Sequence, residues 1–166
     1  EFIAPKLNTV RVAFIGVGAR GSGHAKQIAA IEGTEVVGIS DLYTDLAEKS
    51  SFNCQEAGNG KRHKNIAIYS GAEDKWKAML DEVKPDAVFI STNWDNHAPM
   101  AIETMKSGAH AFVEVPMATN IDDLWNIVNT SEKTRKHCMM MENVNYGRDE
   151  LMYLNMCRKG VIGEFL

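Results

Sequence analysis

Residues 10 to 21 read Val10-Arg-Val-Ala-Phe-Ile-Gly16-Val-Gly18-Ala-Arg20-Gly21, and residues 36 to 41 read Val36-Val-Gly-Ile-Ser-Asp41. The first stretch is an apolar run, typical of a buried strand, that leads directly into Gly-x-Gly-x-x-Gly. The second is another apolar run, and it ends in an acid 20 residues beyond the third glycine. Together they predict a strand, a glycine loop, a helix and a second strand, as at the start of a doubly wound parallel sheet.

Each glycine of this loop has an expected physical role. Gly16 permits the tight turn out of the strand, Gly18 lets the backbone approach a pyrophosphate, and Gly21 lets the next helix pack close to the sheet. The N–H groups of residues 20–24, at the positive end of that helix, are expected to form an anion site, to which Arg20 could add a charge-assisted contact. We therefore predict that the loop binds a dinucleotide; the alternative is a glycine-rich turn of a flavodoxin-like fold that binds none.

The acid at the end of the second strand selects the dinucleotide. Asp41 would accept hydrogen bonds from the adenosine ribose hydroxyls and would repel a 2′-phosphate. Leu42 follows where an arginine could have bound that phosphate. The predicted cofactor is therefore NAD rather than NADP.

Composition and charge exclude several classes of protein. The chain has 166 residues, 45% of them hydrophobic and 24% charged, as expected for one globular domain with a sizeable core. A net charge of −4, with no basic cluster beyond the short run Lys61-Arg-His-Lys64, argues against nucleic acid or an anionic membrane as a partner. No apolar run approaches the roughly 20 residues needed to cross a bilayer. The cysteines are odd in number and contain no Cys-x-x-Cys pattern, so neither a disulfide framework nor a metal site is predicted.

Strand and helix patterns alternate along the chain, which predicts one Rossmann-type α/β domain over residues 1–166, with three layers and a parallel sheet. We expect strands at residues 10–17, 34–40, 66–69, 87–91, 110–114 and 138–142. We expect helices at residues 22–31, 44–57, 73–82, 97–107, 121–134 and 148–158. Residues 58–65 read as an exposed polar loop, and Met139-Met-Met141 reads as part of a buried strand.

The loop after the fourth expected strand carries two candidate cofactor contacts, because ligands of such sheets bind beyond the carboxyl ends of the strands. Trp94 could lie against the nicotinamide or its ribose, and His97 could hydrogen-bond a ribose hydroxyl. The alternatives are that Trp94 covers the sheet edge and that His97 satisfies a nearby backbone carbonyl. Their location favours the cofactor roles.

Glu114-Val115-Pro116 ends the fifth expected strand, and with the preceding motifs it resembles the N-terminal domain of the Gfo/Idh/MocA family of NAD(P)-dependent sugar oxidoreductases. This resemblance covers essentially the whole chain and implies a second, C-terminal α/β domain. In typical members the middle residue of Glu-Lys-Pro is a lysine that helps to move the hydroxyl proton during hydride transfer. Val115 can neither donate nor accept a proton, so the usual dehydrogenase mechanism does not carry over.

One branch of that superfamily, glycoside hydrolase family 109, is more similar still and tolerates the loss of the lysine. The similar segments are Ser91-Thr-Asn-Trp94-Asp-Asn-His97-Ala-Pro-Met100, Met141-Glu-Asn143-Val-Asn-Tyr146 and Leu154-Asn-Met156-Cys-Arg158-Lys-Gly160-Val-Ile-Gly163-Glu164. The family's activity is that of an NAD-dependent α-N-acetylgalactosaminidase. The resemblance implies NAD contacts from the Arg20 loop, Asp41, Trp94 to His97, Glu114, Val115 and Asn143, with Tyr146 facing the sugar.

The resemblance also implies a mechanism in which NAD is regenerated in every turnover. Hydride leaves the sugar C3, the acidified C2 proton is removed, the C1 substituent is eliminated, and water and the hydride then return. Tyr146 is the candidate acid or base, with packing as its alternative, and Glu114 is expected to anchor the nicotinamide end. The competing functions are a sugar or cyclitol oxidoreductase of the same superfamily and a non-catalytic nucleotide-binding module.

The final residues, Gly160-Val-Ile-Gly-Glu-Phe-Leu166, read as a turn and the first residues of a strand. We therefore expect a C-terminal substrate domain beyond this chain, which would complete the binding of a small-molecule sugar. A homo-oligomer, if formed, would assemble through that domain. Family members are often exported bacterial proteins, although these residues themselves show no export.

Overall fold

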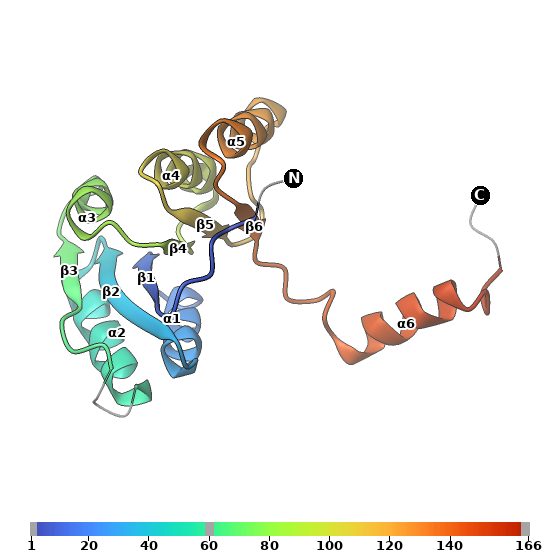
Figure 1. The fold of residues 1–166 in the computed structure, drawn as a ribbon, viewed down its shortest axis with the longest axis horizontal. Helices are drawn as coiled ribbons and strands as arrows, with labels where there is room; N and C mark the ends of the chain where they lie inside the picture. The colour runs from blue at the N-terminus through green and yellow to red at the C-terminus, as the bar shows by residue number, and fades with distance from the viewer. Residues whose placement is uncertain (1–2, 59–61, 164–166) are drawn as a thin grey trace.

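The computed structural model describes residues 3–58 and 62–163 and contains one sheet with helices on both faces (Figure 1). The strands are β1 (Val10–Ile15), β2 (Thr34–Asp41), β3 (Ala67–Ser70), β4 (Ala87–Ile90), β5 (His110–Val113) and β6 (Cys138–Met140). The helices are α1 (Gly21–Ala30), α2 (Thr44–Ala57), α3 (Lys75–Val83), α4 (Trp94–Lys106), α5 (Ile121–Thr134) and α6 (Arg148–Arg158). The strand expected to begin in the last residues of the chain falls on residues 164–166, outside the described part.

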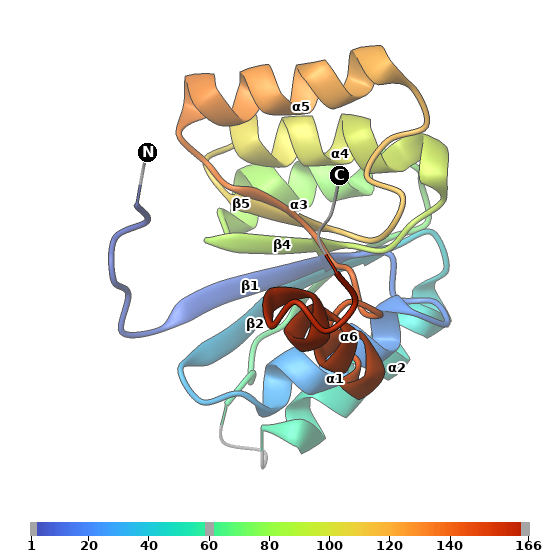
Figure 2. The same cartoon turned by 90° about the vertical axis from the view of Figure 1, so that its right-hand side faces the viewer.

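The described strands pair in parallel in the order β3-β2-β1-β4-β5-β6. The chain therefore reverses its direction of winding between β1 and β4, which is the switch point of a doubly wound sheet. Helices α1 and α2 lie on one face, and α3, α4 and α5 lie on the other (Figure 2). This arrangement confirms the predicted Rossmann-type, three-layer fold.

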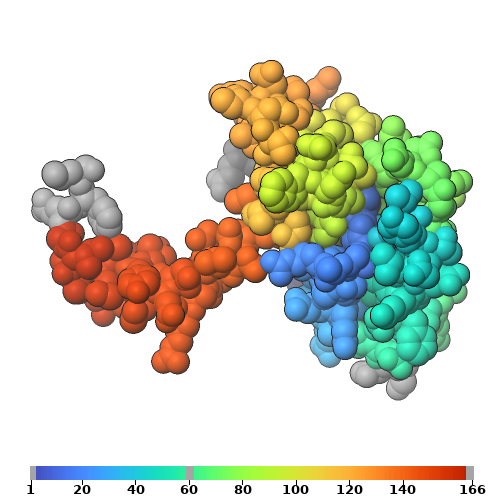
Figure 3. Space-filling view, turned by 180° about the vertical axis from the view of Figure 1, so that it is seen from behind, coloured from blue at the N-terminus to red at the C-terminus, as the bar shows by residue number. Residues whose placement is uncertain are grey.

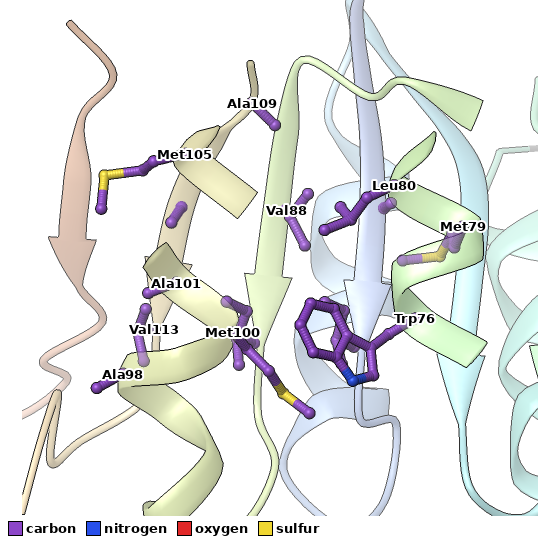
Figure 4. Packing of buried hydrophobic residues seen from close by; sticks show 14 of the residues in the cluster. Trp76, Met79, Leu80, Val88, Ala98, Met100, Ala101, Met105, Ala109 and Val113 are labelled. Carbon is purple, nitrogen blue, oxygen red and sulfur yellow. The ribbon is translucent and has the colours of Figure 1, made fainter. Parts of the chain in front are cut away.

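Strand β1 is apolar and buried from Val12 to Ile15, where both of its faces are covered. Ala13 and Phe14 are fully buried, and they point to opposite faces of the sheet. On the face of α3 and α4, the side chains of Trp76, Met79 and Met105 pack onto the strands (Figure 4). Burying each such large apolar side chain stabilises the fold by roughly 1.5–3 kcal/mol, so this core holds the strand ends in fixed positions.

The structure shifts two element boundaries that matter for the site. Strand β1 ends at Ile15 rather than at residue 17, because Gly16 has a φ of +82° and turns the chain out of the sheet. Helix α4 begins at Trp94 rather than at residue 97, because Asn93 has the extended backbone of an N-cap residue. The connection between β1 and α1 is therefore slightly longer than expected, residues 16–20, and the connection between β4 and α4 is shorter, residues 91–93.

The polar stretch at residues 58–65 is not solvated throughout, as the sequence suggested. The His63 side chain is only 2% exposed. Its Nδ1 accepts a hydrogen bond from the Val36 N–H, and its Nε2 bonds to the Ala29 carbonyl, each at 2.9 Å. The expectation of an exposed loop is therefore wrong at His63, which connects this segment to β2 and α1. Residues 59–61 lie outside the described part.

The expected burial of the methionine run is also wrong. Met139 and Met140 on the edge strand β6 are 50% and 42% exposed. Among the described residues, no helix covers this part of the sheet on the side of α1, where a cavity of about 740 Å³ is lined by Leu7, Phe112 and Met139 among others. Helix α6 projects away from the body instead (Figures 1 and 3). Every residue of α6 is described, and none is buried.

No helix within the described residues combines the length and the apolar character needed to cross a membrane.

Candidate functional site

A cleft of about 400 Å³ lies at the carboxyl ends of β1, β2 and β4. Its lining combines the glycine loop, the end of β2, the start of α3 and the turn before α4. Contributing residues include Gly16, Gly18, Asp41, Tyr43, Glu73, Trp76, Ser91, Asn93 and Asn96. The cleft lies at the switch point of the sheet, where doubly wound proteins bind their ligands.

The three glycines of the loop are needed for different reasons. A Cβ on Gly16 would lie 2.7 Å from the Ser91 carbonyl oxygen, and a Cβ on Gly21 would overlap the Gly16 carbonyl oxygen. These two glycines are therefore required for the loop to pack against the sheet. A Cβ on Gly18 would meet nothing within 4 Å among the described residues, so Gly18 borders open space that a ligand can occupy.

The N–H groups that could bind an anion lie slightly earlier in the chain than the sequence suggested. The Ser22 N–H bonds to the Gly18 carbonyl at 3.1 Å, and the His24 N–H bonds to the Arg20 carbonyl at 3.3 Å. The first turn of α1 therefore uses part of the predicted anion site for its own hydrogen bonds. In the described part of the chain, the N–H groups of residues 19–21 have no acceptor and remain as candidate donors to a diphosphate.

Asp41 is held firmly at the edge of the cleft. Its Oδ2 accepts a hydrogen bond from the Val17 N–H at 2.7 Å, and its Oδ1 accepts one from the Tyr43 N–H at 3.0 Å. A carboxylate can accept about four hydrogen bonds, so lone pairs remain on both oxygens for the hydroxyls of a ribose. The bond to Val17 also ties the glycine loop to the end of β2.

Glu114 and Arg20 form a contact that the sequence did not predict, and His24 joins it. Glu114 is 8% exposed, and its Oε1 lies 2.5 Å from His24 Nε2 and 3.3 Å from Arg20 Nε. The Glu114 Oε2 accepts a longer bond, of 3.3 Å, from the Val115 N–H. No spacing in the sequence relates His24 to Glu114, because α1 and β5 meet only through the order of the strands.

His97 is 1% exposed, and each of its ring nitrogens lies against a backbone carbonyl oxygen. Its Nδ1 lies 2.7 Å from the Pro116 carbonyl oxygen, and its Nε2 lies 3.1 Å from the Thr92 carbonyl oxygen. The ring has no nitrogen left for a ribose hydroxyl. The structure therefore favours the alternative of a carbonyl-bonded histidine over the expected cofactor contact, and His97 connects the turn before α4 to the loop after β5.

Three further predicted site residues, Trp94, Asn143 and Tyr146, are not among the described residues that line the cleft. Trp94 is the first residue of α4 and is 63% exposed, whereas its neighbours Asn93 and Asn96 line the cleft. Asn143 and Tyr146 lie in the exposed segment between β6 and α6, with Tyr146 72% exposed. Their roles stay predictions.

The cleft fits the NAD that the sequence predicts. Gly18 leaves space for a diphosphate, and Asp41 supplies ribose acceptors. The Ser91 hydroxyl, on a residue lining the cleft, is buried without a hydrogen-bond partner among the described residues. An unpaired buried hydroxyl is costly, so a polar ligand that reached it would relieve that cost.

The order of the strands, the glycine loop after β1 and Asp41 at the end of β2 together define a dinucleotide-binding domain of the Rossmann type. Residues 10–142 match the family described as "Oxidoreductase family, NAD-binding Rossmann fold". The chain belongs to this Gfo/Idh/MocA family, and its cofactor is NAD.

Individual proteins and solved structures that are similar to this chain give more specific comparisons than the family as a whole. The chain is 59% identical over 165 residues to "Glycosyl hydrolase family 109 protein 1" of Akkermansia muciniphila, covering 99% of this chain and 34% of that protein. Among solved structures, myo-inositol 2-dehydrogenase from Lactobacillus plantarum matches with a TM-score of 0.78 at 21% identity, over 95% of this chain and 43% of that one. Scyllo-inositol dehydrogenase from Lactobacillus casei, with bound NAD(H) and scyllo-inositol, matches with a TM-score of 0.78 at 17% identity, over 94% and 43%. The chain thus spans about a third of the length of its curated relatives.

Proposed function

We propose that this chain is the NAD-binding domain of a glycosidase that acts on an N-acetylhexosaminide by oxidation, elimination and return of the hydride. The observation that carries the proposal is Val115, which stands where dehydrogenases of the resembling family have a proton-transferring lysine. The high identity to proteins named glycosyl hydrolase family 109 supports the same choice.

The residues of this chain would bind and orient the cofactor along the carboxyl edge of the sheet. Asp41, at the end of β2, would accept the adenosine ribose hydroxyls, and the glycine loop after β1 would hold the diphosphate. Glu114, after β5, would then lie at the nicotinamide end, because β4 and β5 follow β1 in the sheet. Bound NAD supplies a reversible hydride acceptor, and Tyr146 is the proposed acid or base toward the sugar.

We further propose that α6 connects this domain to a substrate-binding part of the protein. Its apolar side chains Leu151, Tyr153 and Leu154 are 44–60% exposed, and no described residue covers them. The relatives are about three times as long as the chain, so they have material that could cover this helix. A homo-oligomer would assemble through that same part.

The experiment uses the protein at the length of its relatives, incubated in D₂O with an aryl α-N-acetylgalactosaminide and a catalytic amount of NAD⁺. The proposal predicts release of the phenol, deuterium at C2 of the product and no accumulation of NADH. Steady accumulation of NADH without phenol would contradict it and favour an oxidoreductase like the inositol dehydrogenases of similar fold. If neither phenol nor NADH appeared, the remaining interpretations would be a non-catalytic nucleotide-binding module or an enzyme that acts on a different sugar.

A further inference from the structure

The Glu114 carboxylate is a buried charge with an unusual set of partners. It is 8% exposed, and a carboxylate at that depth must be paired or strongly hydrogen-bonded to remain charged. Both of its side-chain partners, His24 and Arg20, come from the first turn and N-cap of α1 rather than from its own strand. The carboxylate after β5 is therefore held by the helix that follows the glycine loop.

The two oxygens of this carboxylate are not equivalent. Oε1 receives the short contact from His24 Nε2, at 2.5 Å, and the contact from Arg20 Nε, at 3.3 Å. Oε2 receives only the N–H of Val115, at 3.3 Å, which is at the weak end of hydrogen bonding. Oε1 is thus saturated by α1, whereas Oε2 keeps acceptor capacity.

His24 makes the stronger of the two side-chain contacts. Its side chain is 24% exposed, against 58% for Arg20, so its contact is less screened by water. The more exposed Arg20 can hold Glu114 through Nε and still offer its terminal nitrogens to an anion at the glycine loop. His24 and Arg20 therefore have different roles. His24 fixes the carboxylate, and Arg20 lies between the carboxylate and the diphosphate site.

We propose that His24 is a positioning residue that fixes the Glu114 carboxylate through Oε1 and so presents Oε2 to an N–H or O–H donor of the nicotinamide half of NAD. The inference rests on the cofactor placement of the proposed function, with adenosine at Asp41 and nicotinamide beyond β4. It adds a link between the diphosphate site and the carboxylate after β5, because the helix that would bind the diphosphate also holds that carboxylate. Removing the His24 contact should weaken the contribution of the nicotinamide half of NAD to binding and leave the contribution of the adenosine half unchanged.

The test compares NAD and AMP as ligands of the 166-residue chain, by calorimetric titration of His24→Leu, His24→Gln and the wild type. His24→Leu removes the donor and is expected to weaken NAD binding about tenfold while changing AMP binding by less than about twofold. His24→Gln keeps an N–H donor at about the place of Nε2 and should restore most of the NAD affinity. His137→Gln is the matched control, because His137 precedes β6 at the amino ends of the strands, whereas Glu114 follows β5 at their carboxyl ends, and it should change neither affinity.

A second measurement does not depend on how well the variants fold. In the wild type, the ¹⁵N signal of His24 Nε2 should shift on addition of NAD and stay in place on addition of AMP. An unchanged NAD affinity in His24→Leu, or an equal loss of NAD and AMP affinity, would overturn the positioning role. A wild-type chain that bound neither ligand would instead overturn the cofactor placement itself, so the two failures are distinguishable.

Discussion

At the scale of single residues, Gly18 and Gly21 belong to one loop but face different constraints. The packing of the loop against the sheet has no room for a side chain at Gly21, whereas Gly18 borders open space. A methyl group at Gly18 would therefore meet the ligand and not the protein. The two positions separate the loop's contribution to folding from its contribution to binding.

We expect Gly18→Ala to leave the free energy of unfolding within about 0.5 kcal/mol of the wild type and to weaken NADH binding about tenfold. Gly21→Ala should instead destabilise the fold by about 1–3 kcal/mol, because its Cβ overlaps the Gly16 carbonyl. Urea unfolding and NADH titration of both variants measure these effects. Gly23→Ala is the control: its Cβ has free space within α1, so it should bind NADH normally and gain about 0.5–1 kcal/mol. Normal NADH binding by Gly18→Ala would contradict the assignment.

The Cys54 thiol, fully buried in α2, is expected to make the stability of the fold depend on pH in the alkaline range. Burial raises its pKa from 9.0 to about 11. A thiol whose folded pKa is raised contributes stability that is complete below the unfolded pKa and is lost as the pH rises toward the folded one. We therefore expect the free energy of unfolding to fall by roughly 2 kcal/mol between pH 9 and 11 because of this group.

Urea unfolding at several pH values between 8 and 11 measures this loss. Cys54→Ala should have a flatter pH dependence than the wild type, whatever its stability at pH 8. Cys157→Ala, on α6, serves as the control and should keep the wild-type slope. Equal slopes for all three proteins would show that Cys54 ionises without cost to the fold.

At the scale of elements, α6 differs from the other helices because it makes no buried contact. Its apolar residues are exposed, whereas the corresponding residues of α3, such as Leu80, are packed into the core. The apolar side chains along one side of the helix therefore have different roles in α3 and α6. In α3 they stabilise the described domain, and in α6 they are available to another part of the protein.

We expect Leu154→Ala to change the free energy of unfolding of this chain by less than about 0.5 kcal/mol, because the side chain is 44% exposed and α6 has no buried residue. Leu80→Ala, at 3% exposure, removes a core side chain and should cost about 2–5 kcal/mol. Urea unfolding of the two variants gives the comparison. A large loss in Leu154→Ala would mean that α6 packs onto the domain in solution.

At the scale of the whole molecule, patterns within one segment were predictable and contacts between distant segments were not. The alternation of strands and helices, together with the glycine loop and Asp41, predicted the sheet and the position of the cleft. The burial of His63 was not predictable, because its partners lie in β2 and α1 and are reached by a turn with no hydrophobic signal. The His24–Glu114 contact was missed for the same reason, since α1 and β5 are adjacent only once the strand order is known.

The methionine run shows a different limit of sequence reasoning. Its apolar character correctly predicts a strand, but β6 lies at the edge of the sheet and one of its faces is uncovered. Whether a strand is buried depends on what lies on its two faces, and that information is outside the strand itself. His97 is a similar case, because its two carbonyl partners belong to loops that meet only in the fold.

We propose that NAD lies along the carboxyl edge of the sheet with its adenosine ribose at Asp41. Titration of this chain with NADH and NADPH, in the wild type and in Asp41→Ala, tests it most directly. The wild type should bind NADH at least about tenfold more tightly than NADPH, because the carboxylate accepts the ribose hydroxyls and repels a 2′-phosphate. In Asp41→Ala, NADH binding should weaken by about tenfold or more and the preference over NADPH should disappear. Unchanged NADH affinity in Asp41→Ala would contradict the placement.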